Sequence, residues 1–281
     1  MYLVSFLLFF LSLLRKMSSL STNGVGLAPK RILVWCHGSG DNGRGASAYI
    51  QAVTPQKTLQ DIANDGIRFI FPDARPRPYT LAGGTVTSIW FDRSGGMEPQ
   101  HPEMTESVLA SVAQLETLIE ELMERHDIPS ENIILGGFSM GGGISLQVLA
   151  RTKYRLGAVI ACSSYICDSS PAWDLFKDQQ ARSLTTVSAS SSSSADGSLS
   201  SRDEAAVAAA SCSVANVPIL MCHGDKDDFV RYEWGETTAR RLKSLGANIE
   251  FVSIPNAEHV LTTNEMELVF AWLRKSLQLK N

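Results

Sequence analysis

The chain has little of what marks nucleic-acid-binding or disulfide-rich proteins. Among its 281 residues, 25 are Lys or Arg and 29 are Asp or Glu, so the net charge of −4 offers no basic surface to nucleic acid. The five cysteines are odd in number and include no Cys-x-x-Cys pair, and no pair of His or Cys residues has the spacing of a zinc site. We therefore expect neither nucleic acid nor metal as a partner, and a reducing compartment, the cytoplasm, as the location.

An apolar run at the N-terminus is short for a membrane span. Residues 2–14 form a run of about thirteen mostly apolar residues, whereas a spanning helix needs roughly twenty. The basic pair Arg15-Lys16 follows the run and no Ala-x-Ala site appears, which differs from a secretory signal peptide. Two interpretations stay open: weak membrane association through this run, or a translation start at Met17 that excludes it. In both, residues 1–29 are a leader and disordered segment outside the folded domain.

Six short apolar runs recur at wide spacing and predict buried strands. They are rich in Ile, Val, Leu and Phe without strict alternation, as strands covered on both faces are. Helix patterns occupy the stretches between them, most clearly at 106–125, and a further helix is expected at 264–277. The alternation predicts an α/β fold with a mostly parallel central sheet, helices on both faces and a single domain over 30–281. The six runs are 31–36, 67–71, 132–138, 156–163, 217–222 and 249–254.

Two segments interrupt this alternation. Residues 72–101 are rich in Pro, Gly, Arg and aromatics without any period, and a loop of that length inside a compact domain is usually functional. In 182–213, twelve of thirty-two residues are serine, a composition that buries too little apolar surface to offset its ordering entropy. We expect a functional loop at the first segment and a flexible insertion within the domain at the second.

The sequence Gly137-Phe138-Ser139-Met140-Gly141 stands at the end of one predicted strand and ahead of a predicted helix. In this setting a Gly-x-Ser-x-Gly motif is the nucleophile elbow of the α/β-hydrolase fold, in which a sharp turn exposes the serine hydroxyl. The flanking glycines leave room for two chains that approach closely. The motif and its context predict Ser139 as a nucleophile.

A serine hydroxyl needs a base within hydrogen-bond reach, and the chain has five histidines. His37 and His223 each follow a predicted strand and precede a glycine, which suits turn scaffolding. His101 and His126 flank the helix at 106–125 and are expected in solvent. His259 lies after the last predicted strand and before the last predicted helix, where the general base of this fold belongs. It is the predicted base.

The carboxylate that orients the base should follow the penultimate strand. The segment after 217–222 offers three candidates, Asp225, Asp227 and Asp228, and their spacing alone does not choose among them. Asp225 follows a glycine directly and is well placed to hold its own turn, whereas Asp228 suits solvent.

Two backbone N–H groups should stabilise the oxyanion of the transition state. One belongs to the residue after the nucleophile, Met140. The other is expected in the loop at 36–41, where glycines let the amide of Ser39 point into the site.

Together, these motifs resemble a known family. The sequences at 37–41, 137–142 and 223–227, with the late His259, are similar to the acyl-protein thioesterase and lysophospholipase family of carboxylesterases. The segment 71–80, residues 89–93, Trp234 and the Ser39 that replaces a leucine are most similar to its lysophospholipase-like protein 1 branch. The resemblance covers roughly 31–277 except the serine-rich insertion.

The resemblance implies a hydrolase of acyl esters or thioesters that uses no cofactor. It implies Ser139, Asp227 and His259 as the catalytic triad, which selects one of the three carboxylates. It also implies Ser39 and Met140 as oxyanion donors and Trp90 beside the acyl pocket. The expected substrates are acyl esters or S-acylated proteins and peptides, and their acyl groups are expected to be short if the chain follows that branch. The alternative hypothesis is a catalytically dormant protein of the same fold that binds lipids or acylated peptides.

Overall fold

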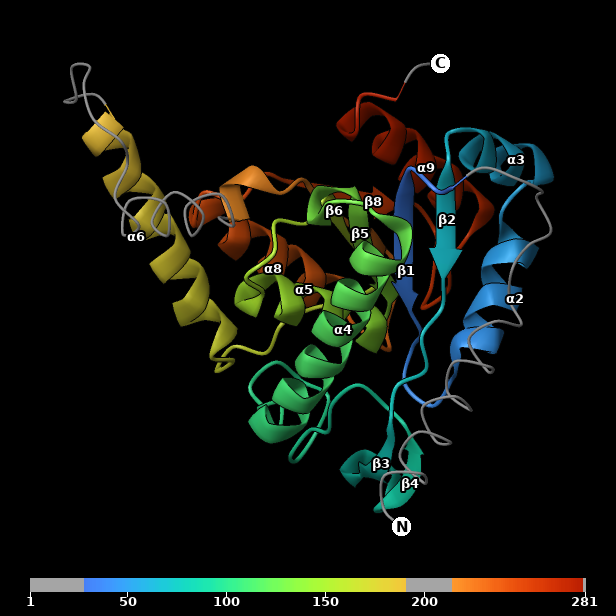
Figure 1. Ribbon diagram of the computed structural model, residues 1–281. Coiled ribbons are helices and arrows are strands. Elements are labelled where there is room, and N and C mark those ends of the chain that lie inside the picture. The colour runs from blue at the N-terminus through green and yellow to red at the C-terminus, as the bar shows by residue number, and fades with distance from the viewer. Residues whose placement is uncertain (1–27, 191–213, 280–281) are drawn as a thin grey trace, which may run out of the picture.

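A six-stranded parallel sheet forms the centre of the computed structural model, which describes residues 28–190 and 214–279 (Figure 1). The strand order is β2-β1-β5-β6-β7-β8, and every neighbouring pair is parallel. The predicted α/β-hydrolase class is confirmed, with strand ends that differ from the predicted ones by at most two residues. The strands are β1 (Arg31–Cys36), β2 (Ile67–Ile70), β5 (Ile133–Phe138), β6 (Ala158–Cys162), β7 (Ile219–Gly224) and β8 (Ile249–Ile254).

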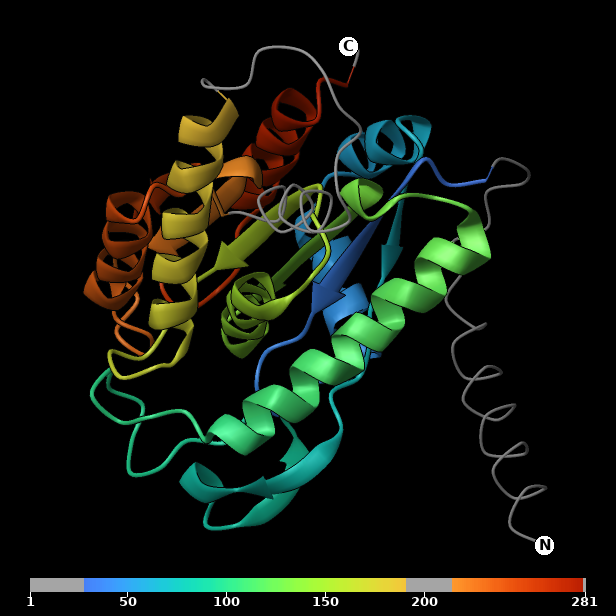
Figure 2. The same ribbon diagram turned by 60° about the vertical axis from the view of Figure 1, so that its left-hand side comes forward.

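Helices cover both faces of the sheet, which is why the strands carry apolar residues without strict alternation (Figure 2). One face packs against α4 (Thr105–His126), α5 (Met140–Arg151), α6 (Ala172–Ser190) and α8 (Tyr232–Ser244). The other face packs against α2 (Gly43–Val53), α3 (Gln56–Asn64) and α9 (Thr263–Ser276). The two helices predicted at 106–125 and 264–277 correspond to α4 and α9.

The carboxyl ends of the parallel strands meet at one rim of the sheet. Cys36 at the end of β1 pairs with Gly137 in β5, Phe138 at the end of β5 pairs with Cys162 in β6, and Cys162 pairs with Cys222 in β7. The loops that follow these strands therefore lie side by side, although they are far apart in sequence.

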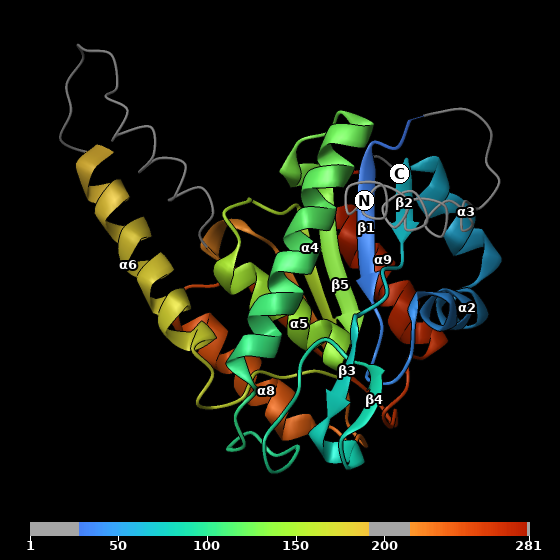
Figure 3. The same ribbon diagram turned by 60° about the horizontal axis from the view of Figure 1, so that its bottom comes forward.

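The long segment at 72–101 contains a β-hairpin that the sequence did not predict. Strands β3 (Pro76–Tyr79) and β4 (Thr85–Ser88) pair antiparallel and lie beyond the carboxyl end of β1 (Figure 3). Between them the chain makes a 3-10 turn (Thr80–Ala82) and then turns at Gly83, whose φ is 64°. Each strand has four residues and one contains two prolines, which argue against a strand unless it lies at an edge, as it does here.

Helix α6 runs to Ser190, so the first residues of the predicted insertion at 182–213 are helical. The rest of that insertion, and the predicted leader up to residue 27, lie outside the described residues. Further 3-10 turns occupy Ser130–Asn132 and Val214–Asn216. Within 28–190 and 214–279, no helix is both long enough and apolar enough to cross a membrane.

Candidate active site

Ser139 occupies a sharp turn between β5 and α5. Its backbone has φ 55° and ψ −123°, a conformation that costs a non-glycine residue of the order of 1–3 kcal/mol and is typical of functional sites. The glycines on either side make the turn feasible. A Cβ atom on Gly137 would lie 2.5 Å from the carbonyl oxygen of Cys36, and a Cβ atom on Gly141 would lie 2.0 Å from the same oxygen. Only glycine fits at these two positions.

Neighbouring strands hold this turn from outside. The amide of Ser139 donates to the carbonyl oxygen of Cys162 at 2.9 Å, which continues the β5–β6 pairing by one residue. The hydroxyl of Ser164 donates to the carbonyl oxygen of Ser139 at 2.6 Å. The Ser139 side chain stays only 9% exposed, so its position is set by packing and by hydrogen bonds.

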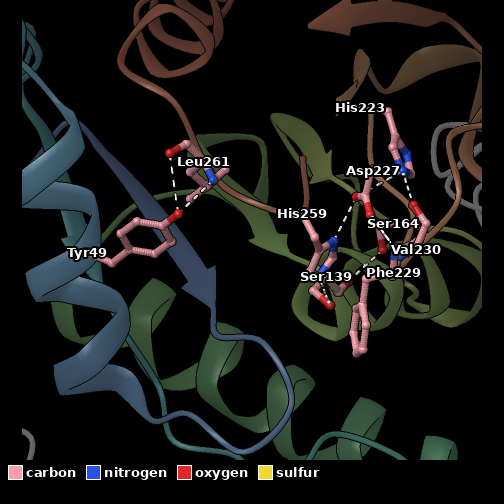
Figure 4. A network of polar contacts seen from close by, with 9 residues as sticks. All are labelled: Tyr49, Ser139, Ser164, His223, Asp227, Phe229, Val230, His259 and Leu261. Atoms are coloured by element: carbon pink, nitrogen blue, oxygen red, sulfur yellow. Dashed lines mark hydrogen bonds and ion pairs between the residues drawn. The ribbon is translucent and has the colours of Figure 1, made fainter. Parts of the chain in front are cut away.

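His259 and Asp227 complete a continuous row of contacts with Ser139 (Figure 4). Nε2 of His259 lies 3.0 Å from Oγ of Ser139, and Nδ1 lies 2.7 Å from Oδ2 of Asp227. His259 comes from the loop between β8 and α9, and Asp227 comes from the loop after β7. The carboxylate fixes the tautomer in which Nδ1 carries the proton, and Nε2 is then free to accept the serine proton.

The Asp227 carboxylate is buried but well bonded. Burial raises its pKa, but hydrogen bonds from His223, His259 and the amide of Val230 outweigh this effect and hold the pKa below its ordinary value. Oδ1 accepts from the amides of Phe229 at 3.2 Å and Val230 at 2.9 Å. The group is therefore charged at neutral pH and directed at the imidazole.

The other two carboxylates of this loop lie elsewhere. Oδ1 of Asp225 accepts from the amide of Asn256 at 2.7 Å, so it holds the loop that carries His259 and not its own turn. Asp228 is exposed. Geometry therefore separates the three carboxylates that spacing could not.

The scaffolding role predicted for His37 and His223 agrees with their hydrogen bonds. Nδ1 of His37 donates to the carbonyl oxygen of Gly38 at 2.7 Å, while Nε2 accepts from the amide of Ala74 at 3.0 Å. Burial lowers the pKa of His37, which favours this neutral form. Nε2 of His223 donates to the carbonyl oxygen of Val230 at 2.7 Å and lies 3.4 Å from the carboxylate of Asp227.

Ser39 and Met140 line the same small pocket beside Ser139. Met140 begins α5, and the first N–H groups of a helix have no acceptor within it. The loop of Ser39 is held from the hairpin, because the amide of Gly40 donates to the carbonyl oxygen of Ser88 at 2.9 Å. The two residues that were predicted to supply oxyanion donors therefore line one pocket.

Trp90 is not among the residues that line this pocket, and its predicted place beside the acyl group stays a prediction. Its side chain is fully buried, and the indole N–H donates to the carbonyl oxygen of His37 at 2.9 Å. The indole ring packs against the His37 ring at 5.2 Å between centroids. The indole thus supports the loop of Ser39 from below, which sequence similarity alone could not distinguish from substrate contact.

Several residues around the site were missed from the sequence. Arg93, Ser163 and Tyr165 line the pocket, and the segment 72–101 that contains Arg93 had been expected to be functional as a whole. Tyr49 in α2 holds the histidine loop, since its hydroxyl accepts from the amide of Leu261 at 2.8 Å (Figure 4). The sequence carried no signal for Tyr49, because the contact depends on how α2 packs.

Within 28–190 and 214–279, one cluster brings three metal-ligand side chains together, namely Cys162, Cys222 and Glu265. All three are buried at 0–1% exposure. Burial raises the pKa of Glu265 to about 7, although hydrogen bonds from Cys162 and from the backbone of Thr262 oppose the rise. The cluster lies behind the triad, in the packed layer beneath α9, and does not line the pocket beside Ser139.

Two family models match the chain. The model of the phospholipase/carboxylesterase family matches residues 25–177, just over half of the chain, and includes Ser139. The model of the prolyl oligopeptidase family matches residues 109–280 and includes Ser139, Asp227 and His259.

Individual relatives agree with the first of these families. Lysophospholipase-like protein 1 of Mus musculus is 29% identical over 241 residues, which cover 86% of this chain and 84% of the mouse protein. Acyl-protein thioesterase 1 homolog 1 of Dictyostelium discoideum is 29% identical over 253 residues, which cover 87% of this chain and 90% of that protein. The crystal structure of Zea mays acyl-protein thioesterase 2 superimposes with a TM-score of 0.65 at 28% identity and covers 91% of this chain and 97% of the maize chain.

Proposed function

The chain belongs to the phospholipase/carboxylesterase family and is a serine hydrolase of esters or thioesters. On this premise, we propose that Ser139, His259 and Asp227 act as a catalytic triad and that the reaction passes through an acyl-enzyme. The observation that carries the proposal is the row of contacts from Ser139 Oγ to His259 Nε2 at 3.0 Å and from His259 Nδ1 to Asp227 Oδ2 at 2.7 Å. Hydroxyl, imidazole and carboxylate in this order are the parts that activate a serine at neutral pH.

In the acylation step, Ser139 Oγ attacks the carbonyl carbon of the substrate while its proton passes to Nε2 of His259. The tetrahedral intermediate places its negative oxygen against the amides of Ser39 and Met140, and each such donor is worth roughly 2.7–4 kcal/mol of barrier. Asp227 stabilises the imidazolium that forms. When the intermediate collapses, His259 protonates the departing thiol or alcohol and the acyl group remains on Ser139.

Deacylation repeats these steps with water. Nε2 of His259 takes a proton from a water molecule, whose oxygen attacks the acyl carbonyl, and the second intermediate collapses with return of the proton to Ser139. The products are a carboxylic acid and the regenerated serine. None of the steps calls on a cofactor.

The names of the relatives indicate the substrate class. Two of the similar proteins are called acyl-protein thioesterases, and we propose S-acylated proteins or small acyl esters as substrates of this chain. We propose the cytoplasm as the location, because Cys36, Cys162, Cys167 and Cys222 are free thiols in the described part of the chain.

A fluorophosphonate probe tests the nucleophile. We expect the probe to label the wild-type protein covalently and to lose this reaction in Ser139→Ala, because only a serine activated by a base attacks the phosphorus. The readout is probe fluorescence on a gel. Ser145→Ala is a matched control, since Ser145 is a buried serine of α5 whose hydroxyl donates to the carbonyl oxygen of Gly141 at 2.8 Å and which does not line the pocket.

Labelling that persists in Ser139→Ala would assign the nucleophile elsewhere. Absence of labelling in the folded wild type would favour the dormant binding protein over the hydrolase mechanism proposed here.

A further inference from the structure

The pocket beside Ser139 is small and polar for a site that accepts an acyl group. Its cavity volume is about 20 Å³, whereas ligand pockets measure about 300–1,000 Å³ and are lined predominantly by apolar side chains. Here hydroxyl-bearing side chains and one cation form much of the wall, and apolar contact comes from few residues. Besides Ser139, the polar lining consists of Ser39, Tyr79, Arg93, Ser163, Ser164 and Tyr165.

Arg93 is a buried cation that forms no direct ion pair among the described residues, although the buried Glu103 carboxyl is near enough to raise its pKa. Its side chain is 4% exposed, and its guanidinium carbon lies 4.7 Å from the ring centroid of Tyr165 and 5.0 Å from that of Phe91. In the described part of the chain, its side-chain hydrogen bond goes to Sγ of Cys167 at 2.8 Å, a weak acceptor, and no carboxylate forms an ion pair with it.

The charge of Arg93 persists despite burial. Burial opposes the charged form, but Cys167, Tyr165 and Glu103 raise the pKa of the guanidinium overall. A charge removed from water costs several kcal/mol unless a partner compensates it. The two aromatic rings hold the group in place, and the buried Glu103 favours its charge without forming an ion pair, so N–H groups of Arg93 other than the one that donates to Cys167 are left for a ligand in the pocket.

Ser163 is a second group in this wall without a partner. It is 1% exposed, and its hydroxyl oxygen has no hydrogen-bond partner among the residues that the structure describes. Its φ of 47° is the left-handed conformation, which is uncommon for a serine. Backbone strain and an unsatisfied buried hydroxyl at the same residue are features that functional sites show.

From Arg93 and Ser163 we infer that the pocket contains an anion-binding subsite, and that the substrate carries a carboxylate or similar anionic oxygen group close to the scissile carbonyl. The inference rests on the proposed function and names the substrate class of the same site. The planar guanidinium binds two oxygens of a carboxylate in parallel, and the hydroxyl of Ser163 donates to one of them. The enzyme then prefers short anionic substrates to neutral ones of equal length.

The anion can belong to the acyl group or to the leaving group, and two substrate pairs distinguish these sources. The first pair is the para-nitrophenyl monoester of glutarate and para-nitrophenyl pentanoate, which have acyl chains of equal length. The second is acetoxy-nitrobenzoate and its methyl ester. With the enzyme-free rates subtracted, we expect kcat/KM of the wild type to favour the anionic member of one pair by about tenfold or more.

Variants test whether Arg93 causes that preference. Arg93→Met should reduce the ratio of anionic to neutral kcat/KM by about 10- to 100-fold, and Arg93→Lys should retain part of it because the charge remains without the planar fork. Arg77→Met is the matched control, since Arg77 bonds to Ser107 and Ser111 away from the pocket. It should keep the wild-type ratio.

A wild type without preference in either pair, or an Arg93→Met ratio equal to that of the wild type, would overturn the inference. If Arg93→Met does not fold, the wild-type ratios and Arg93→Lys decide. Hydrolysis of pentanoate without any anionic preference would reject the subsite but leave the hydrolase mechanism intact. Failure to cleave any of the esters, together with failure to react with fluorophosphonate, would reject the proposed function itself.

Discussion

At the scale of single residues, the loop after β7 places three carboxylates in different surroundings. Asp227 is buried and bonds to the imidazole of His259, Asp225 bonds to the backbone of Asn256, and Asp228 is exposed. Their roles therefore follow from burial and partners, although all three lie within four residues of sequence.

We expect Asp227→Asn to lower kcat by about four orders of magnitude, because an amide can stabilise the wrong tautomer of His259 and cannot stabilise the imidazolium. Asp225→Asn should lose activity by a much smaller factor through the loop of Asn256, and Asp228→Asn should leave it nearly unchanged. Steady-state hydrolysis of para-nitrophenyl acetate measures all three. Equal losses in the three variants would contradict the assignment of the acid.

The residues that could be predicted from sequence are those fixed by local pattern. Ser139 follows from its motif and His259 from its position after the last strand, and the structure brings these two within 3.0 Å. The surroundings of Trp90 and Arg93 could not be predicted, because they depend on which side chain faces the pocket. A segment whose apolar residues follow no helical or strand periodicity does not indicate which of its side chains point toward the site.

At the scale of elements, the site depends on how closely β1 and α5 approach each other at the elbow. The Cβ that an alanine would add at Gly141 meets the carbonyl oxygen of Cys36 at 2.0 Å and that of His37 at 2.7 Å. Both are backbone atoms of a central strand and its loop, so they cannot move aside without separating the strand from the helix.

Gly141→Ala should therefore destabilise the protein by about 3 kcal/mol or more, or prevent folding. The matched control is Gly38→Ala, where an added Cβ has its nearest contact at 3.6 Å and the backbone is not left-handed. Urea unfolding followed by circular dichroism compares the free energies of unfolding. A Gly141→Ala variant as stable as Gly38→Ala would show that the elbow is not packed as described.

The helices and strands that could be predicted from the sequence are those with a clear local pattern of apolar residues. The six strands and helices α4 and α9 match their predicted ranges closely, since buried strands and long amphipathic helices carry their pattern locally. The hairpin β3–β4 has short strands, and its prolines argue against strand structure. Its place follows from contacts with the loop of Ser39, such as the bond between Gly40 and Ser88.

At the scale of the whole molecule, a buried carboxyl behind the triad links stability to pH. Glu265 is 1% exposed and lies in the first turn of α9, where its amide donates to the hydroxyl of the N-cap residue Thr262 at 3.1 Å and its carboxyl accepts from the backbone of Thr262. Burial raises its pKa from 4.5 to about 7. The folded protein therefore holds a proton that the unfolded chain releases between these values.

The sign of the effect follows from linkage. Because the folded state binds more protons in this window, the free energy of unfolding falls as pH rises from 4.5 to about 7, by about 3 kcal/mol in total. Glu265→Gln keeps the cap without a titrating group. The variant should therefore gain stability relative to wild type between about pH 5 and pH 8, as measured by urea unfolding. If the free energies of unfolding of the wild type and of Glu265→Gln changed with pH in parallel, the Glu265 carboxyl would not have a raised pKa in the folded protein.

The central claim, an acyl-enzyme on Ser139, is tested most directly by trapping it. Wild-type protein mixed with para-nitrophenyl acetate and quenched in acid during the first turnover is digested, and its peptides are analysed by mass spectrometry. We predict a burst of para-nitrophenol and one acetyl group on the peptide that contains Ser139, at the serine itself. Ester hydrolysis without any acylated peptide, or with the acetyl group on another residue, would contradict the mechanism.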